Sequence, residues 1–466
     1  MMKLLLSEIA RAVGGKLQGK DKIIMMVVTD SRDVNGRNVD GILAAGNNTV
    51  IDYSTLLFAA LRGERIDGHI FVKEILENGN SAIIDNPEYI ADGTIMVDDV
   101  KNALGKLGRY YRENYLNNAY CIGITGSVGK TTTKEMVAVA FASKKIHKTA
   151  GNKNSLIGLP LTILEAPLDT EILILEAGMN QKGEIAILSE IAKPDIAIIT
   201  NIGTAHIENM GNIENILKEK ISIITGLRNN GKLILNGDDV ILSGKQTVSN
   251  DIIYFACKNT NADYWADNIG YKDCSTVFTL HNKEKSVQIQ IPTIGEHNVL
   301  NALAAYAAAT EAGLDSKAIV DGLKSFISSG NRQRIYRQND IIVIADCYNA
   351  SPESMAAALA VLSLGDGRKV AVLGDMLELG EQSKELHARV GEYAAKNNVD
   401  ILIAIGDFAK HIKAGFGKDC KTFGLNEKNI AADYINELLE PGDTVLFKAS
   451  NLIDFGSLIK TINKIY

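Results

Sequence analysis

The sequence predicts an α/β protein of three domains: a small N-terminal α/β domain, a central P-loop domain with a parallel sheet, and a C-terminal Rossmann-like domain. The chain has 466 residues, more than a single hydrophobic core usually organises. Short apolar runs alternate with helix-length amphipathic segments, the pattern of parallel strands that are buried on both faces. This alternation is interrupted once, over residues 252–291, and restarts after Gly330.

The first domain is expected to span residues 1–118. It holds short apolar runs separated by turns such as ERIDGH, which is typical of a small α/β unit. Its last residues, 112–118, read RENYLNN and are polar. We interpret this stretch as a linker to the next domain.

The central domain is expected to span residues 119–330. Its apolar runs ILILE (172–176), DIAIIT (195–200) and KLILN (232–236) predict buried parallel strands. Alternation in VQIQI (287–291) instead predicts antiparallel strands across 252–291. A long alanine-rich helix is expected to begin near His297.

The C-terminal domain is expected to span residues 331–466. The runs IIVIAD, KVAVLGD, DILIAIGD and TVLFKAS predict four buried strands separated by helices, which is a second doubly wound sheet. Asp346, Asp375, Asp407 and Lys448 each stand at the carboxyl end of one of these strands. Open sheets of this kind bind their ligands at that edge.

A glycine-rich turn after an apolar run is the clearest functional signal in the chain. Residues 119–133 read AYCIGITGSVGKTTT, so a buried strand leads into a loop that carries Lys130 and Thr131. Such a loop binds phosphate through backbone N–H groups and a helix N-terminus, while the lysine reaches the terminal phosphates and the threonine holds Mg²⁺. The usual motif has a glycine where this chain has Ile124. The predicted ligand of residues 126–132 is ATP or GTP.

Three residues further along the central domain are candidates for metal or catalytic work. Glu176 ends a strand in the position where P-loop proteins place a second acidic group for Mg²⁺. His206 follows another strand end, in TNIGTAHIENMG. Lys220 lies on a predicted helix, where the pattern cannot separate it from Lys218.

Polar residues also mark the next helix and the start of the last domain. Asn298 and Asn301 lie three apart at the start of a helix, so that both amides can face one side. The motif DCYNASPESM places Asp346, Tyr348 and Asn349 at a strand end; Arg332 precedes that strand. A turn alone would not need this combination of side chains.

Composition narrows the classes of partner. The formal net charge is −7 and basic residues form no block, so a nucleic-acid partner is not expected. No segment approaches the ~20 consecutive apolar residues of a membrane-spanning helix. The five cysteines lie far apart and lack the spacing of a metal site. We therefore expect a soluble cytoplasmic protein with reduced, mostly buried thiols.

Taken in order, these motifs make the chain resemble the Mur ligases, the ATP-dependent amide-forming enzymes of peptidoglycan precursor synthesis. The resemblance rests on GITGSVGKTT, LEAGMN, TNIGTAH, GEHNVLNALAA and DCYNASPESM in their order along the chain. It also includes TDSR (29–32), LFAALRGERIDGHIF (57–71) and GNKNSLIGLP (151–160). The run VLGDMLELGEQSKELH is similar to a hallmark of the member that adds D-alanyl-D-alanine.

The resemblance implies a reaction and its substrates. ATP would activate the carboxylate of UDP-MurNAc-tripeptide to an acyl phosphate, which the amine of D-alanyl-D-alanine would attack. The products would be ADP, phosphate and an amide, and the process served would be cell-wall biogenesis, cell shape and cell division. ATP and Mg²⁺ are the implied cofactors, and we expect a monomer.

The resemblance also implies roles for individual residues. Lys130, His206 and Lys220 would be catalytic, with Lys220 in the place of a carbamylated lysine that turns an ammonium into an anion beside Mg²⁺. The implied metal ligands are Thr131, Glu176, His206 and carbamylated Lys220. The implied ATP-binding residues are Gly126, Ser127, Val128, Gly129, Lys130, Thr131, Thr132, Asn298, Asn301, Arg332 and Asp346. The implied substrate-binding residues are Ser31, Arg32, Asp67, Gly68, His69, Asn154, Tyr348, Asn349 and Lys448.

Four features depart from the family pattern. Extra residues lie near 37–54, which points to a rebuilt UDP-binding edge. Ser155 stands where a second asparagine is usual, and Ser222 replaces an acidic residue. The motif KASN ends in Asn451, where the family usually has an arginine near the incoming amine. The last departure bears on the dipeptide more than on the ATP chemistry.

Two alternatives stay open at this point. One is a related amide ligase that acts on another UDP-sugar peptide or on a folate-like acid, against which the run DMLELG argues. The other is a degenerate, non-catalytic Mur-like protein that binds nucleotide or precursor. Retention of Lys130, Thr131, Glu176, His206 and Lys220 argues against the second.

Overall fold

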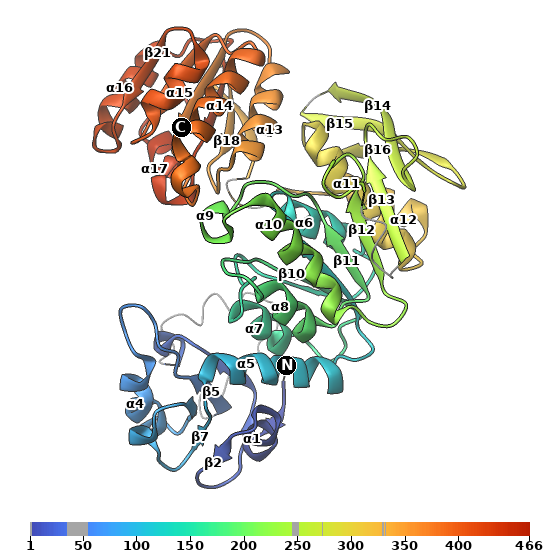
Figure 1. Ribbon diagram of the computed structural model, residues 1–466, viewed down its shortest axis with the longest axis vertical. Coiled ribbons are helices and arrows are strands. Elements are labelled where there is room, and N and C mark those ends of the chain that lie inside the picture. The colour runs from blue at the N-terminus through green and yellow to red at the C-terminus, as the bar shows by residue number, and fades with distance from the viewer. Residues whose placement is uncertain (1, 35–54, 245–250, 273, 329, 331) are drawn as a thin grey trace.

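The structure is a computed structural model that describes residues 2–34, 55–244, 251–272, 274–328, 330 and 332–466. Figure 1 shows three bodies stacked along the longest axis, with the N-terminal body at the bottom and the C-terminal body at the top. A main sheet flanked by helices organises each body. The predicted α/β fold class with N-terminal, central and C-terminal domains is confirmed.

The N-terminal domain is built on a five-stranded sheet with the order β2-β7-β6-β5-β4. Strands β4 to β7 are parallel and β2 is antiparallel to β7. The strands are β2 (Lys16–Leu17), β4 (Met26–Val28), β5 (Leu56–Ala59), β6 (Ser81–Ile84) and β7 (Thr94–Met96), with a separate ribbon of β1 (Leu4–Leu5) and β3 (Ile23–Ile24). The helices are α1 (Leu6–Val13), α2 (Ser31–Val34), η2 (Gly68–Phe71), α4 (Val72–Glu77), η3 (Pro87–Tyr89) and α5 (Val100–Asn114).

The expected linker at residues 112–118 is wrong at its first residues, because helix α5 continues through Asn114. Arg112 is completely buried, and its guanidinium donates to the carbonyl oxygens of Ala192 (2.9 Å), Ala119 (3.1 Å) and Leu116. The polar residues that suggested a linker therefore include Arg112, whose guanidinium connects α5 to the central domain. Figure 1 shows α5 lying between the N-terminal sheet and two helices of the central domain, α7 (Gly158–Glu165) and α8 (Glu184–Ala192).

The central domain contains a nine-stranded sheet with the order β16-β15-β14-β13-β12-β11-β8-β10-β9. All pairings from β9 to β14 are parallel, as the continuous apolar runs predict. The parallel strands are β8 (Tyr120–Thr125), β9 (Ile146–Lys148), β10 (Ile172–Glu176), β11 (Ile196–Ile199), β12 (Lys232–Asn236), β13 (Asp251–Ala256) and β14 (Tyr264–Lys272).

Antiparallel pairing begins later than the sequence suggests. Among the described residues of the central sheet, antiparallel pairing is limited to β14 with β15 (Ser275–Asn282) and β15 with β16 (Ser286–Ile291). Strand β13 continues the parallel series, so the expectation of antiparallel strands was wrong for the start of 252–291. A strand's own pattern does not reveal the direction of its neighbour.

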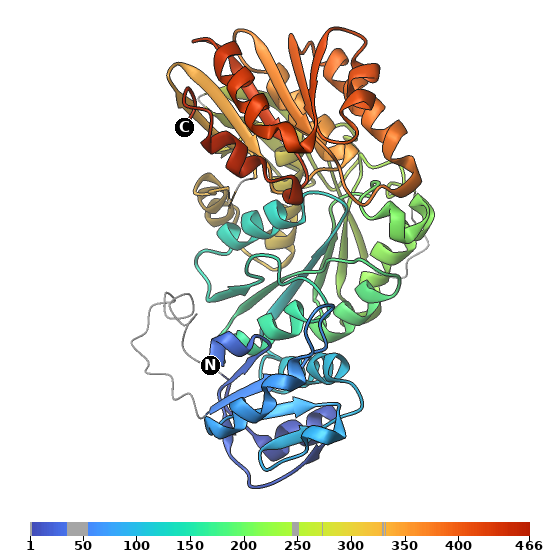
Figure 2. The same cartoon turned by 90° about the vertical axis from the view of Figure 1, so that its left-hand side faces the viewer.

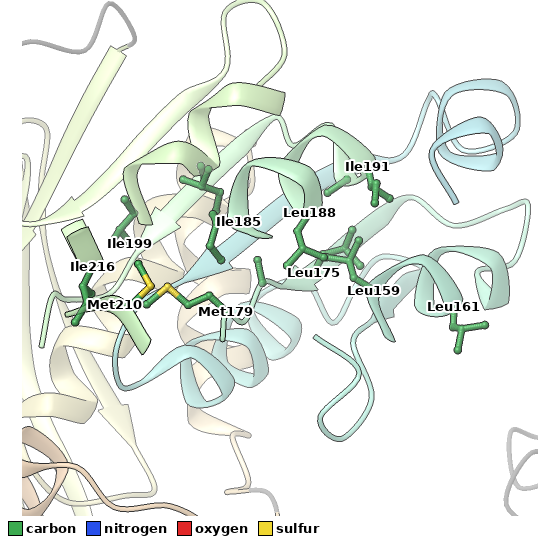
Figure 3. Packing of buried hydrophobic residues seen from close by; sticks show 14 of the residues in the cluster. Leu159, Leu161, Leu175, Met179, Ile185, Leu188, Ile191, Ile199, Met210 and Ile216 are labelled. Carbon is green, nitrogen blue, oxygen red and sulfur yellow. The ribbon is translucent and has the colours of Figure 1, made fainter. Parts of the chain in front are cut away.

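Two separate hydrophobic cores cover the two faces of the central sheet, because side chains alternate along each strand. Leu173 and Leu175 face helices α7, α8 and α10, whereas Ile172 and Ile174 face α6, α11 and α12. Figure 3 shows part of the first core, including Leu175, Leu188 and Met179. The helices are α6 (Lys130–Ala140), α7 (Gly158–Glu165), α8 (Glu184–Ala192), α9 (Ile207–Met210), α10 (Ile213–Ile221), η4 (Ser222–Gly226), α11 (Glu296–Glu311) and α12 (Ser316–Lys324).

The C-terminal domain has a six-stranded sheet with the order β17-β18-β22-β19-β20-β21, parallel except at the edge strand β17. Its strands are β17 (Arg334–Gln338), β18 (Ile341–Asp346), β19 (Lys369–Gly374), β20 (Ile401–Ile405), β21 (Cys420–Phe423) and β22 (Thr444–Lys448). All four predicted strands are present. The helices are α13 (Pro352–Ser363), η5 (Gly380–Gln382), α14 (Ser383–Lys396), α15 (Ala409–Phe416), η6 (Leu425–Glu427), α16 (Lys428–Leu438), η7 (Asn451–Ile453) and α17 (Phe455–Lys460).

The C-terminal sheet stands above the carboxyl edge of the central sheet, as the turned view in Figure 2 shows. Helix α9, which follows β11, lies on the side of the central domain that faces the C-terminal domain (Figure 1). The two carboxyl edges therefore meet at one interface, where the candidate site lies.

Among the helices of the described ranges, none is long and apolar enough to cross a membrane.

Arg112 offers a direct test of how α5 is held. Arg112→Ala should lower the free energy of unfolding by at least about 3 kcal/mol, because several buried carbonyl groups lose their donor. The half-exposed Arg109, which pairs with Glu113 and with Glu190 of the central domain at 3.1 Å each, is the matched control. Because exposed ion pairs contribute little, Arg109→Ala should change stability by less than about 1 kcal/mol. Thermal and urea unfolding would measure both, and equal effects would contradict this account of α5.

Candidate functional site

A cavity of about 360 Å³ lies between the carboxyl edges of the central and C-terminal sheets. The sequence predicted about half of the polar residues that line it, although the motifs come from distant parts of the chain. The predicted residues that line it are Ser127, Val128, Gly129, Lys130, Thr131, Thr132, Asn154, Glu176, His206, Asn298, Asn301, Arg332, Asp346, Tyr348, Asn349 and Lys448.

The phosphate-type loop connects β8 to α6, as predicted. Gly126 and Gly129 have φ values of 150° and 87°, in a range that residues with a side chain rarely adopt. A Cβ on Gly126 would also lie 1.9 Å from the Thr200 hydroxyl oxygen. Ile124, which departs from the usual motif, is fully buried in β8. The departure arises because the strand core extends through this position before the loop begins.

The segment after β11 holds the loop in place. Asn201 Oδ1 accepts from the Val128 amide at 2.9 Å, and Asn201 Nδ2 donates to the Val128 carbonyl at 3.0 Å. Ser127 Oγ accepts from the Gly203 amide at 2.8 Å and donates to its carbonyl at 3.2 Å. Sequence reasoning missed Asn201 and Gly203 as site residues, although both lie within the motif TNIGTAH. Asn201 acts through its side-chain amide and Gly203 through its backbone, and neither residue type alone signals contact with a phosphate loop.

Lys130 stands at the mouth of the loop. Its Nζ donates to the carbonyl oxygen of Gly126 at 2.7 Å, which keeps the amine above the backbone amides of the loop. Burial lowers the pKa of Lys130, while the charge of Glu176 acts in the opposite direction. A phosphate group here would meet one lysine and the positive N-terminal end of α6.

Glu176 is a buried carboxylate, 2 % exposed, at the end of β10. Its Oε2 accepts from the Thr131 hydroxyl and its Oε1 from Asn154 Nδ2, each at 2.9 Å. Lys134, which sequence reasoning did not select, is buried with its Nζ 4.0 Å from Glu176 Oε2. Thr131 Oγ1 and Glu176 Oε2 are therefore adjacent oxygen atoms at the phosphate loop.

The same oxygens fit the requirements of Mg²⁺. This ion keeps several waters and is usually held by one or two carboxylates together with substrate phosphates. Among the residues that the structure describes, no cluster of three or more His, Cys, Asp and Glu side chains could hold a metal alone. The arrangement suits a cation that arrives with a nucleotide.

The structure separates the two candidate lysines of helix α10. Lys218 is exposed and pairs with Glu214 at 2.9 Å, whereas Lys220 is 1 % exposed and packs against Met179, with Nζ 3.8 Å from Sδ. Burial lowers the pKa of Lys220 well below its usual value, and the charge of Lys130 adds to this effect. Lys220 lies behind Met179, which lines the cavity and belongs to the core in Figure 3.

His206 is contacted by the C-terminal domain. It adopts the left-handed conformation, with φ 63°, and its Nδ1 lies 2.6 Å from Glu378 Oε2. Glu378 belongs to the run DMLELG, and its close contact with His206 lowers the pKa of the carboxyl group. Sequence reasoning noted this run only as a family hallmark. The contact gives Glu378 a physical role beside the cavity.

A network of amides connects the P-loop helix to the C-terminal domain. Thr133 Oγ1 donates to Asn301 Oδ1 at 3.1 Å, and Asn301 Nδ2 donates to Asn298 Oδ1 at 3.3 Å. Asn298 Nδ2 donates in turn to Gln333 Oε1 at 2.7 Å. Asn298 and Asn301 do face one side of α11, as their spacing predicted. Gln333 was missed, because one glutamine after a glycine-containing turn carries no signal.

The C-terminal wall of the cavity contains a closed charge pair. Lys448 Nζ, 2 % exposed as a residue, donates to Asp346 Oδ2 at 2.6 Å and to the Asn349 carbonyl at 3.0 Å. The Arg332 guanidinium lies over the Tyr348 ring, 3.7 Å from its centroid. The charge of Lys448 is therefore already balanced by Asp346. Lys448 is not a free replacement for the arginine that the family usually has at the position of Asn451.

The five N-terminal candidates do not line this cavity. Exposed Arg32 pairs with Asp30 at 2.5 Å, next to Ser31 at the start of α2. Asp67 caps η2, which begins at Gly68, and lies 2.6 Å from His69 Nδ1. His69 is fully buried, and its Nε2 accepts from the Asp85 amide. His69 thus shapes this loop from within. The extra segment near 37–54 lies outside the described residues.

Two family models match the chain: the Mur ligase middle domain over residues 124–309, and the glutamate ligase domain of the Mur ligases over residues 331–451. The chain is 36% identical over 485 aligned positions to the UDP-N-acetylmuramoyl-tripeptide–D-alanyl-D-alanine ligase of Bacillus subtilis, with 99% of each chain covered. It belongs to the Mur ligase family. The corresponding ligase of Escherichia coli is 33% identical, with 90% of this chain and 89% of the relative covered.

Solved Mur ligases share the whole architecture. A crystal structure of MurF from Acinetobacter baumannii matches with a TM-score of 0.90 at 31% identity, and the match covers 99% of both chains. MurF from Thermotoga maritima, in complex with ADP, matches with a TM-score of 0.82 at 28% identity, over 94% of this chain and 97% of that one. The three-domain Mur ligase fold therefore extends over the full described chain.

The buried Lys220 amine predicts a pH-dependent stability difference. In CO₂-free buffer, Lys220→Met should raise the unfolding midpoint of this Mur ligase at pH 7, because the variant no longer buries an amine. The unfolded lysine keeps its proton up to about pH 10.4, whereas the folded one loses it at lower pH. Between these pKa values the unfolded state binds more protons, so rising pH stabilises the wild type and the difference should shrink.

Thermal unfolding at several pH values would measure this difference. Lys218→Met is the matched control, since Lys218 is exposed on the same helix, and it should show no such trend. A stabilisation by Lys220→Met that is the same at pH 7 and pH 10 would contradict the depressed pKa of Lys220.

Proposed function

We propose that this chain is the ATP-dependent ligase that joins D-alanyl-D-alanine to UDP-MurNAc-tripeptide in peptidoglycan synthesis. The observation that carries the proposal is the juxtaposition of Lys130, Thr131 and Glu176 at the phosphate loop, facing the C-terminal sheet across one cavity. Support for the substrates comes from the B. subtilis ligase, which is named for this reaction and matches over 99% of both chains.

The reaction divides into two steps. A carboxylate oxygen of the tripeptide attacks the γ-phosphorus of ATP, the bond to ADP breaks, and an acyl phosphate forms. The dipeptide amine then attacks the acyl carbon, loses a proton, and expels inorganic phosphate as the amide forms. The first step needs charge stabilisation on the phosphoryl group, which Lys130 and the backbone amides of residues 126–132 can supply.

Thr131 and Glu176 are the proposed ligands of Mg²⁺, which would neutralise phosphate charge when bound. The burial of Glu176 supports this role, because a carboxylate bound to Thr131 and Asn154 is held in one orientation. We propose that ATP, rather than another nucleotide, is the substrate, on the ground that a related MurF was solved with ADP.

His206 and carbamylated Lys220 are proposed as further ligands of the metal, in addition to Thr131 and Glu176. A carbamate forms when a neutral amine attacks CO₂ and a proton leaves, so a depressed amine pKa favours it. The resulting carbamate would place a negative charge near the metal site and Lys130. His206, fixed at Nδ1 by Glu378, would keep Nε2 free for the phosphate or its metal.

The remaining candidates divide between nucleotide and substrate. Asn298, Asn301, Arg332 and Asp346 are proposed to contact ATP, because the amide network links the P-loop helix with the C-terminal wall. The proposed contacts to the growing peptide are Asn154, Tyr348, Asn349 and Lys448. The proposed contacts to the UDP-sugar are Ser31, Arg32, Asp67 and Gly68, with His69 shaping the loop.

The absence of an arginine at Asn451 bears on how the dipeptide carboxylate is held. Lys428 Nζ donates to the Ile453 carbonyl at 2.5 Å, so a cation lies beside the η7 loop that contains Asn451. Because Lys448 is paired with Asp346, Lys428 is the better candidate to balance an incoming carboxylate. This arrangement is compatible with D-alanyl-D-alanine as the amine.

We further propose that the domains divide at residues 1–118, 119–330 and 331–466, with α5 as a shared element at the first boundary. We also propose that the chain acts as a monomer, because the central and C-terminal domains of a single chain are sufficient to form both walls of the cavity. Use of ATP and a UDP-linked precursor supports a cytoplasmic location.

A phosphate-release assay tests the proposed function. The protein, ATP and Mg²⁺ with UDP-MurNAc-tripeptide should release phosphate only when D-alanyl-D-alanine is present, and mass spectrometry should detect the amide product. Lys130→Ala should lower turnover by about 100-fold or more, because the phosphoryl charge loses its cation, while exposed Lys145→Ala should leave turnover unchanged. Turnover with a different amine but not with this dipeptide would overturn the substrate assignment. Wild-type turnover by Lys130→Ala would contradict the role of the loop.

A further inference from the structure

Glu353 joins the C-terminal domain to the segment that holds the phosphate loop. It lies in the first turn of α13, and its Oε1 accepts from both the amide (2.8 Å) and the hydroxyl (3.0 Å) of Thr204. Thr204 belongs to the central domain and follows β11. One carboxylate oxygen on one domain therefore binds two donors on the other.

Hydrogen bonds link this contact to the phosphate loop. Gly203 precedes Thr204, and it exchanges two hydrogen bonds with the side chain of Ser127 in the phosphate loop. A path of direct contacts thus runs from Glu353 through Thr204 and Gly203 to Ser127. Movement of α13 away from the central domain would remove the Glu353 contacts from Thr204, the residue next to the one that bonds Ser127 Oγ.

Steric fit makes the contact specific. A Cβ on Gly203 would lie 2.6 Å from Glu353 Cδ, so any side chain at this position would displace the carboxylate. The backbone of Gly203 is not in the left-handed region, and alanine could adopt its conformation. Glycine is therefore needed here for the approach of Glu353 and not for the turn itself.

Helix capping does not explain Glu353. An acidic residue in a first turn stabilises a helix through the dipole. Helix α13 already has a capping box between Ser351 and Ser354 and a proline at its start. Glu353 directs its Oε1 to Thr204 instead of to the free amides of its own helix.

We propose that Glu353 is a positioning residue that couples docking of the C-terminal domain to the geometry of the phosphate loop, through Thr204 and Gly203. The inference rests on the proposed function for its kinetic consequence and on the structure alone for its effect on docking. When α13 docks, the Thr204 amide and hydroxyl are fixed, Gly203 holds Ser127, and the loop reaches the shape that binds phosphate.

A double-mutant cycle tests the coupling. Glu353→Ala and Gly203→Ala should each lower kcat by about ten-fold or more, because each removes a charge-assisted contact between the domains. In the Glu353→Ala background, Gly203→Ala should have little further effect, since the carboxylate with which its Cβ collides is gone. The control is Glu392→Ala on α14, which removes an exposed carboxylate from the same domain and should leave kcat unchanged.

Small-angle X-ray scattering with a non-hydrolysable ATP analogue gives a second readout that needs no turnover. Glu353→Ala should increase the radius of gyration relative to wild type and Glu392→Ala, with an unchanged melting temperature. Thr204→Val should increase the radius of gyration less, because this variant keeps the backbone donor to Glu353. If Gly203→Ala fails to fold, Thr204→Val takes its place as the second variant. Additive effects in the cycle, or an unchanged radius for Glu353→Ala, would overturn the proposal. Absence of wild-type ligation would instead defeat the proposed function and leave the scattering test intact.

Discussion

The buried carboxylate of Glu176 is the constraint on which the site depends. A carboxylate at 2 % exposure is costly unless each oxygen is paired, and here Thr131 and Asn154 provide the pairing while Lys134 lies nearby. These contacts connect β10 with the first turn of α6 and with the loop before α7. The position of the phosphate loop relative to the neighbouring strand is therefore set before any ligand binds.

The interface between the central and C-terminal domains is mainly polar at the cavity. The amide network through Asn301 and Gln333, the pair of Glu378 with His206 and the contact of Glu353 with Thr204 all lie across it. Polar contacts of this kind exchange readily with water, unlike an apolar core. We propose that the interface closes over a nucleotide and opens again during the reaction, as in other enzymes that enclose their substrates.

The sequence predicted the sheets well, because strands buried on both faces appear as continuous apolar runs. It also placed the phosphate loop, Glu176 and the paired asparagines of α11, whose chemistry depends on short spacings. It mistook Arg112 for part of a linker, because only the folded structure shows the carbonyl groups that surround this guanidinium. The direction of β13 was not predictable either, since pairing is a property of two strands.

The roles that the sequence did not reveal depend on contacts between residues that are far apart in the chain. Lys218 and Lys220 have the same chemistry and lie one residue either side of Glu219, so only burial distinguishes them. Glu353 and Glu378 look like ordinary surface carboxylates until the C-terminal domain is placed against the segment after β11. Such roles depend on the packing of whole domains, which no local pattern encodes.

We propose that the cluster of Lys130, Thr131 and Glu176 promotes activation of a substrate carboxylate by transfer of a phosphoryl group from ATP. The most direct measurement uses UDP-MurNAc-tripeptide labelled with ¹⁸O in the reacting carboxylate, followed by mass spectrometry of the released phosphate. An acyl phosphate requires one labelled oxygen to leave with phosphate as the amide forms. Amide formation in which the phosphate carries no label would contradict the account.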